Sequence, residues 1–134
     1  MRFVVLGNLE IPIRCATAVL DAGGEVCAII SMPEHTRRDN STDVAGFARG
    51  RNIAYHEIED INSPESVGLI RGITPDYILS IWPQMIERAV LEIPRICAIG
   101  THPTALPFNR GRHPLHWLIS LGIAESKMSF FRME

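Results

Sequence analysis

The sequence predicts an α/β protein whose open, mostly parallel sheet carries helices on both faces. Short apolar runs rich in β-branched residues alternate with segments in helical spacing. The runs lack the alternation of polar and apolar residues, which is typical of strands buried on both faces. The 134 residues are 46% hydrophobic and 21% charged, as in ordinary globular proteins. We therefore expect residues 1–134 to form a single domain with one core.

The first half of the chain begins with a strand and a helix. Residues 2–7, "RFVVLG", form an apolar run that ends in a turn-forming glycine. Residues 12–22 have apolar positions in helical spacing, and Gly23 suits the end of a helix. Residues 25–30, "EVCAII", predict the second strand.

The middle of the chain repeats this alternation. A short helix is expected over residues 41–51, which begin with the capping residue Ser41, and a strand over residues 52–58. The next helix is expected over residues 63–72, with Pro64 in its first turn. The polar residues 32–43, "MPEHTRRDNSTD", read as a mobile loop.

The second half completes the pattern. "DYILSIW", residues 76–82, predicts the fourth strand, and residues 84–91 predict a helix. "ICAIG", residues 96–100, predicts the fifth strand, and residues 125–133 have alternating apolar positions that predict another. This order indicates a Rossmann-like sheet, in which ligands bind outside the carboxyl ends of the strands.

Composition and motifs exclude several classes of function. A net charge of −2, from 13 basic and 15 acidic residues, predicts no broad nucleic-acid surface. The first turn, "GNLEIP", lacks the glycines of a dinucleotide site, and no phosphate-binding GxxxxGK[ST] motif occurs. The apolar run in residues 1–7 is too short for a signal peptide, and nothing predicts a membrane span. We expect a cytoplasmic protein.

Cysteine and histidine spacing indicates neither disulfides nor a metal site. Cys15, Cys27 and Cys97 are odd in number, lie in apolar runs and form no CxxC pair, so buried free thiols are expected. His113 and His116 are spaced like a ligand pair but have no third ligand or acidic partner nearby in sequence. We therefore predict no bound metal.

The stretch after the fifth expected strand, residues 101–117, contains three histidines, three prolines and two arginines. One interpretation is a structured loop, stiffened by its prolines and closed by hydrogen bonds from Thr104 and Asn109. A single histidine at a strand end is more often structural than catalytic. Residues 101–117 taken together, however, indicate a functional site rather than a structural loop alone.

Residues 102–122, "HPTALPFNRGRHPLHWLISLG", resemble the signature of the folate-dependent formyltransferases. "MRFVVLGN", "LDAGGEVCAIISMP" and "PDYILSIWPQMI" resemble other segments of that family in order and spacing. The resemblance implies a formyltransferase-type fold and an enzyme of one-carbon metabolism. Its reaction would transfer a formyl group from 10-formyltetrahydrofolate to a primary amine.

The resemblance also implies roles for single residues. His102 matches the family's catalytic histidine, which relays protons or stabilises the oxyanion. The family has an asparagine donor two positions earlier, where this chain has Gly100, so His102 or a backbone N–H would carry more of that stabilisation. The loop that lines the family's pterin pocket, mainly with backbone groups, matches Trp82, Pro83, Gln84, Met85 and Ile86. Met85 and Ile86 fit equally well as helix core.

The remaining signature residues are expected to contact substrate or shape the loop. Arg110 and Gly111 match the family's Arg-Gly pair, which shapes the loop. Arg112 and His113 are candidates to meet a phosphate or sugar of the acceptor, although solvated loop charges are the commoner outcome. Thr104 and Asn109 are likewise expected to contact substrate or shape the loop.

The acceptor is not named by the sequence. We rank the amine of a nucleotide-linked amino sugar ahead of initiator methionyl-tRNA, because Gly100 is atypical and no basic surface is evident. A formyltetrahydrofolate hydrolase and a catalytically silent folate-binding module are alternatives. The family's cleft aspartate would follow beyond Glu134, so we expect a domain truncated at its C-terminal end, with weak folate binding and little transfer.

Overall fold

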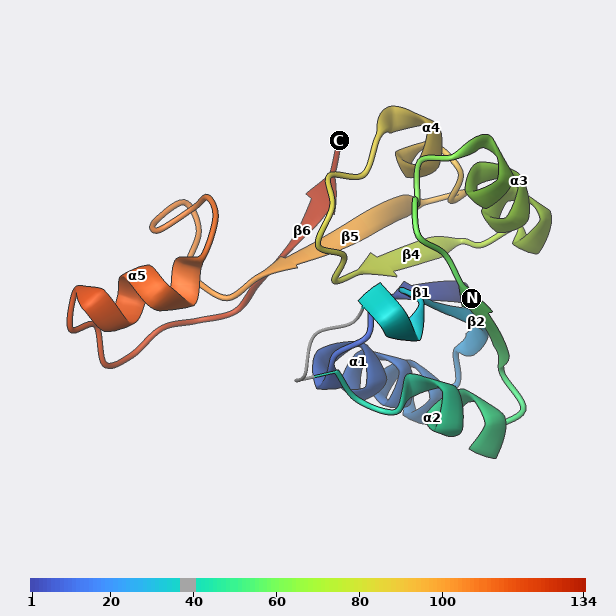
Figure 1. Cartoon of the computed structure of the whole chain (residues 1–134), viewed down its shortest axis with the longest axis horizontal. Helices are drawn as coiled ribbons and strands as arrows, with labels where there is room; N and C mark the ends of the chain where they lie inside the picture. The colour runs from blue at the N-terminus through green and yellow to red at the C-terminus, as the bar shows by residue number, and fades with distance from the viewer. Residues whose placement is uncertain (37–40) are drawn as a thin grey trace.

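The computed structural model describes residues 1–36 and 41–134, and its centre is a mostly parallel sheet (Figure 1). The described strands are β1 (Arg2–Leu6), β2 (Glu25–Ser31), β3 (Ala54–Glu57), β4 (Tyr77–Ser80), β5 (Cys97–His102) and β6 (Ser129–Met133). Their order in the sheet is β3-β2-β1-β4-β5-β6. All neighbouring pairs are parallel except β5 and β6, which are antiparallel. The predicted fold class is confirmed.

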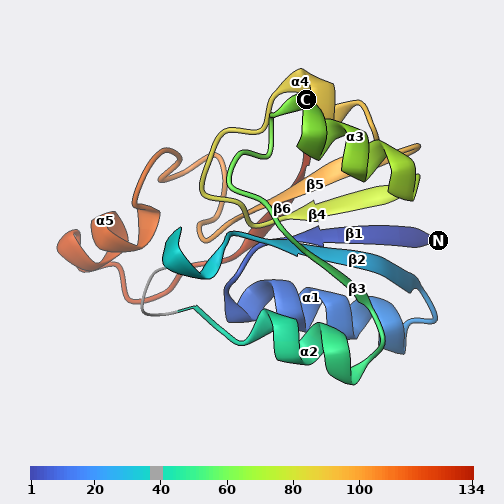
Figure 2. The ribbon, with the colours of Figure 1, turned by 45° about the vertical axis from the view of Figure 1, so that its right-hand side comes forward.

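Helices cover both faces of this sheet (Figure 2). The described helices are α1 (Glu10–Asp21), α2 (Val44–Gly50), α3 (Pro64–Ile73), α4 (Arg88–Leu91) and α5 (Pro114–Ser120), with a 3-10 turn at Glu34–Thr36. Helices α1 and α2 lie on one face and α3 and α4 on the other, whereas α5 lies beyond the end of β5 and β6.

The alternation of side chains along β1 divides the core into two clusters. Val4 and Leu6 pack with residues of α3 and α4, and Val5 packs with residues of α1 and α2. All three are fully buried, as expected for a central parallel strand. The outer strands β3 and β6 are half-buried or exposed, because each has a neighbour on one edge only.

The helix expected over residues 84–91 begins later than its periodicity indicates. Helix α4 starts at Arg88, and the preceding residues form a turn held by Asn62. The Asn62 amide nitrogen donates to the Met85 carbonyl at 2.9 Å, and its amide oxygen accepts from the Glu87 N–H at 2.8 Å. A side chain far away in sequence thus satisfies backbone groups that would otherwise pair within a helix.

Two other expectations need correction. The helix expected from residue 41 starts at Val44, and its cap is Asp43 rather than Ser41, because the Asp43 carboxylate accepts from the Gly46 N–H at 2.7 Å. The three cysteines are free but half-buried, not buried. Partial desolvation raises the pKa of the Cys15 thiol, so this side chain stays protonated near neutral pH.

The loop expected over residues 32–43 lies partly outside the described residues; its described part contains the turn at Glu34–Thr36. In the part of the chain that the structure describes, no helix is long and apolar enough to cross a membrane.

Candidate functional site

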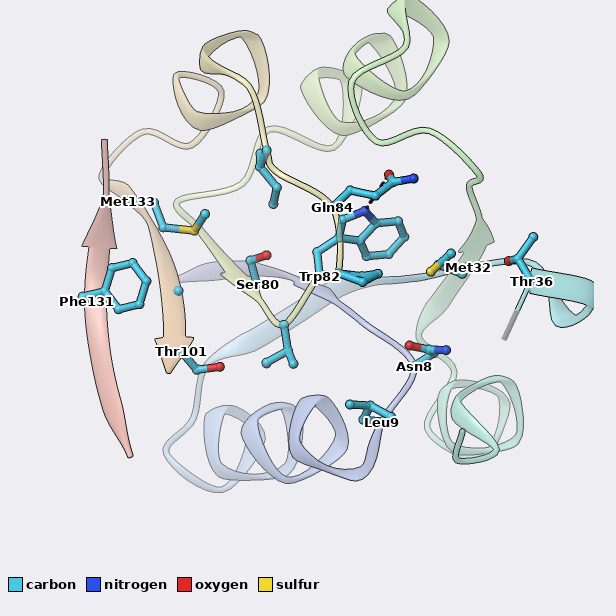
Figure 3. A pocket seen from close by; sticks show the side chains of 14 residues that line it. Asn8, Leu9, Met32, Thr36, Ser80, Trp82, Gln84, Thr101, Phe131 and Met133 are labelled. Carbon is cyan, nitrogen blue, oxygen red and sulfur yellow. Dashed lines mark hydrogen bonds between the residues drawn. The ribbon is translucent and has the colours of Figure 1, made fainter. Parts of the chain in front are cut away.

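The carboxyl ends of β1, β2, β4 and β5 open into a cavity of about 580 Å³ (Figure 3). This is the edge at which parallel α/β sheets bind ligands. Its lining residues come from five strands and the segments that follow them: Asn8, Leu9, Met32, Thr36, Ser80, Ile81, Trp82, Pro83, Gln84, Ile86, Gly100, Thr101, Phe131 and Met133.

The segment after β4 forms one wall of the cavity. The indole N–H of Trp82 donates to the Gln84 side-chain oxygen at 3.2 Å, and the Gln84 amide nitrogen donates to the Glu59 carbonyl at 3.3 Å. Ile86 is buried and lines the cavity. The Met85 side chain is 87% exposed and does not line the cavity. Met85 and Ile86 both precede α4, so neither is a helix residue, and Met85 is not part of the core.

The turn between β1 and α1 forms the opposite wall. Gly7 has a φ of +136°, which an L side chain rarely adopts. A Cβ at this position would lie 2.7 Å from the Ile81 carbonyl oxygen and 2.8 Å from Pro12 Cγ. The next residue, Asn8, is almost fully buried and donates to Ser41 Oγ at 2.9 Å. Because Gly7 has no side chain, the turn after β1 can lie close to the backbone of Ile81 in the other wall.

Strands β5 and β6 form the third wall. A Cβ at Gly100 would lie 2.8 Å from Phe131 Cζ and 3.1 Å from both Cγ and Sδ of Met133. The space that a side chain at position 100 would occupy is therefore filled by two apolar side chains of β6. Both also line the cavity (Figure 3).

His102 ends β5 and is held by the loop that follows. Its ring Nε2 lies 3.1 Å from the Asn109 carbonyl oxygen. A carbonyl oxygen only accepts, so this contact requires the hydrogen on Nε2 and leaves Nδ1 as the ring acceptor in the neutral form. His102 is half-buried and lies beside the cavity without being one of its lining residues.

Thr104 holds this loop in shape, as the sequence predicts. Its fully buried hydroxyl donates to the Phe108 carbonyl at 2.9 Å. Ser129 on β6 donates to the Thr104 carbonyl at 2.7 Å and accepts from the Leu106 N–H at 3.1 Å. Asn109 has a φ of +51°, and its carbonyl rather than its side chain contributes, by accepting from His102.

Replacing Thr104 with valine should lower the free energy of unfolding by about 1–2 kcal/mol, because the Phe108 carbonyl loses its buried donor. Urea denaturation measures this loss. Thr17→Val is the matched control, since Thr17 donates to the Ile13 carbonyl in α1, where the helix backbone still supplies a donor. Equal small losses for both variants would contradict this role of Thr104.

The signature's charged residues lie outside the cavity. Arg110, Gly111, Arg112 and His113 are exposed, and none lines the cavity. His113 directly precedes α5 without a side-chain hydrogen bond to the helix, and its ring meets that of His116 edge-on, with centroids 5.5 Å apart. Among the described residues, no group of histidine, cysteine or acidic side chains is arranged to hold a metal ion.

Several lining residues are not among the site residues that the sequence predicts. Asn8, Met32 and Thr101 each lie within two residues after the end of a predicted strand, so the rule that ligands bind at carboxyl ends points to their positions. Ser80 lies inside the strand expected over residues 76–82, because the observed β4 ends two residues earlier than predicted. Phe131 and Met133 reach the cavity because β6 pairs with β5 in the opposite direction. Their contribution follows from strand pairing, which local sequence does not specify.

The whole chain is similar in sequence to curated formyltransferases. It is 30% identical to the methionyl-tRNA formyltransferase of Citrifermentans bemidjiense and 30% identical to that of Geotalea uraniireducens. Each match covers 100% of this chain but 44% of the relative, so the chain spans less than half the length of these relatives. A comparison with protein-family profiles found no match.

Solved structures share the fold. The phosphoribosylglycinamide formyltransferase of Bacillus halodurans matches with a TM-score of 0.79 at 14% identity, over 100% of this chain and 72% of that one. A formyltetrahydrofolate deformylase of Pseudomonas putida matches with a TM-score of 0.70 at 16% identity, over 99% of this chain and 49% of that one. At these identities the likeness concerns the arrangement of strands and helices.

Proposed function

We propose that this chain, which belongs to the folate-dependent formyltransferase family, binds 10-formyltetrahydrofolate in the described cavity and takes part in transferring its formyl group to a primary amine. The observation that carries this proposal is the position of the cavity, next to the strand that ends in His102. Its volume of about 580 Å³ is in the range of small-molecule sites.

The cavity has the character that a flat heteroaromatic ligand requires. Trp82, Ile86, Met133 and Leu9 supply apolar surface. The backbone from Trp82 to Ile86 supplies polar groups at one edge. The two hydrogen bonds from the Asn62 side chain, to the Met85 carbonyl and the Glu87 N–H, hold that backbone in place. We propose that Trp82, Pro83, Gln84 and Ile86 contact the folate ring, and that Met85 contributes through its backbone alone.

His102 is the residue that we propose as proton carrier. When bound, 10-formyltetrahydrofolate supplies the carbon that the amine attacks. Because Nε2 donates to Asn109, the open Nδ1 is the nitrogen able to accept a proton from the amine and return it to the leaving nitrogen. In this arrangement His102 does not also donate to the developing oxyanion, and Gly100 has no side chain to do so.

For the acceptor, the names of the relatives favour methionyl-tRNA over the amino sugar nucleotide that the sequence ranks first. Arg110, Arg112 and His113 lie exposed on the loop before α5, where a phosphate or sugar of either acceptor has access to them. A tRNA acceptor would place the reaction in the cytoplasm. Since the relatives are about twice as long, we propose that acceptor recognition involves residues outside this chain.

Adding 5-formyltetrahydrofolate, a stable reduced folate, should raise the melting temperature of the chain. Ligand at tenfold the dissociation constant adds about 1.4 kcal/mol to the free energy of unfolding, a shift of several degrees for a domain of this size. Differential scanning fluorimetry measures it. Trp82→Ala should remove the shift and Trp117→Ala, on α5 outside the cavity, should keep it.

The outcomes separate the candidate functions. No shift at millimolar ligand would overturn the proposed folate site. A shift without transfer to methionyl-tRNA or to an amino sugar nucleotide, in a version continued past Glu134, would favour the silent binding module. Release of free formate without an amine product would favour the hydrolase.

A further inference from the structure

The side-chain hydroxyl of Ser80 faces the cavity and has no hydrogen-bond partner among the described residues. Ser80 is the last residue of β4, only 5% exposed, and lines the cavity. Among the described residues its Oγ makes no hydrogen bond. Because this hydroxyl is open to the cavity, water can pair with it in the free protein, and a ligand that displaces the water keeps the hydrogen bond only if it presents an acceptor there.

Most other polar side chains of the cavity already have partners. Asn8 donates to Ser41, and the Thr36 hydroxyl donates to the Pro33 carbonyl at 2.8 Å. Trp82 and Gln84 are bonded to each other. The Thr101 side chain also has no partner among the described residues, but it is half-buried and so more exposed than Ser80. Ser80 is thus the less exposed of the two lining hydroxyl residues without a partner.

Strand register places Ser80 beside Gly100 on β5. Leu6, Ser80, Gly100 and Phe131 are successive partners across four neighbouring strands, so they lie on one face of the sheet. Gly100 contributes no side chain, and Phe131 and Met133 present carbon and sulfur there. Ser80 supplies the hydroxyl of this row, and Figure 3 shows it projecting between Met133 and Trp82.

The same register relates Ser80 to His102. Residues two apart on a strand share a face, so His102 lies on the face of β5 that carries Gly100 and therefore on the side of Ser80. His102 follows Gly100 at the open end of β5. A ligand group that approaches His102 along this face of the sheet from within the cavity lies between the Ser80 hydroxyl and the Phe131 and Met133 side chains that cover Gly100.

We propose that Ser80 Oγ donates a hydrogen bond to the formyl oxygen of the bound formyl donor. This inference rests on the proposed function, which brings the formyl group next to His102. Ser80 then provides from β4 the donor that the side chain at position 100 does not provide from β5. The proposed contacts to the folate ring come from the segment after β4, so the contribution of Ser80 is specific to the formyl group.

The test compares two ligands that differ only in that group: 10-formyl-5,8-dideazafolate, a stable analogue, and 5,8-dideazafolate. Isothermal titration calorimetry gives the dissociation constant of each for the chain and for Ser80→Ala. The variant should bind the formylated compound about five- to tenfold more weakly, as expected for one neutral hydrogen bond, and bind the other unchanged. The ratio of the two constants is independent of any change in stability.

Ser31→Ala is the matched control. Ser31 is a fully buried serine at the end of β2 whose hydroxyl donates to the Met32 carbonyl at 3.1 Å, and it does not line the cavity. For Ser31→Ala, the ratio of the two dissociation constants should equal that of the unmodified chain. Equal weakening of both ligands by Ser80→Ala, or no weakening of either, would overturn the assignment of Ser80 while leaving the folate site intact. Failure of the unmodified chain to bind either compound would overturn the proposed function itself.

Discussion

Replacing Gly7 with alanine should lower the free energy of unfolding by about 2–5 kcal/mol. One part of the loss is the backbone strain of a side chain at a φ of +136°, which costs about 1–3 kcal/mol. The other part is overpacking, because the new Cβ meets the Ile81 carbonyl oxygen at 2.7 Å and the Pro12 ring at 2.8 Å. The Ile81 oxygen is a backbone atom between two sheet-end segments, so it cannot rotate away. Chemical denaturation measures the loss.

The same substitution should weaken folate binding, because Gly7 and Ile81 belong to opposite walls of the cavity. Gly68→Ala is the control: Gly68 is exposed in α3, has no positive φ and has no atom near its would-be Cβ. That change should be neutral or stabilise the helix by up to about 1 kcal/mol. A Gly7→Ala protein as stable as the Gly68→Ala protein would show that the turn after β1 relaxes without cost.

The strands and helices could be predicted because their signals are local. Val4, Val5 and Leu6 are apolar without interruption, as a strand buried between two helical layers requires, and the structure buries all three. The start of α4 could not be predicted in the same way. Periodicity places residues 84–87 in the helix, but Asn62, more than twenty positions earlier, pairs with their backbone.

The candidate site was predictable in its location and only partly in its residues. Trp82 and Ile86 line the cavity, as the expected segment after β4 implies. Ser80 was missed because a serine at the end of an apolar strand gives no motif, and its significance lies in having no partner. The contact from His102 to Asn109 depends on a seven-residue loop closing on itself, which the spacing alone does not specify.

Replacing His102 with alanine should lower formyl transfer by about 100-fold or more while changing folate affinity little. The loss belongs to the chemical step, because His102 lies beside the cavity lining and its proposed task is to carry a proton. The assay needs a protein with measurable transfer, and a version continued past Glu134 is suited to it because the relatives are about twice as long. His56→Ala on β3, at the far edge of the sheet, is the control for loss of an imidazole.

His102→Gln separates the chemical role from the structural one. The glutamine amide can donate to the Asn109 carbonyl, as Nε2 of the histidine does at 3.1 Å, so the loop should keep its shape. An amide does not take up a proton near neutral pH, so the relay through the open ring nitrogen is lost. We therefore expect the glutamine variant to melt close to the unmodified protein and to be as slow in transfer as the alanine variant. Near-normal turnover in the glutamine variant would show that His102 acts by holding the loop, and that the proton moves by another route.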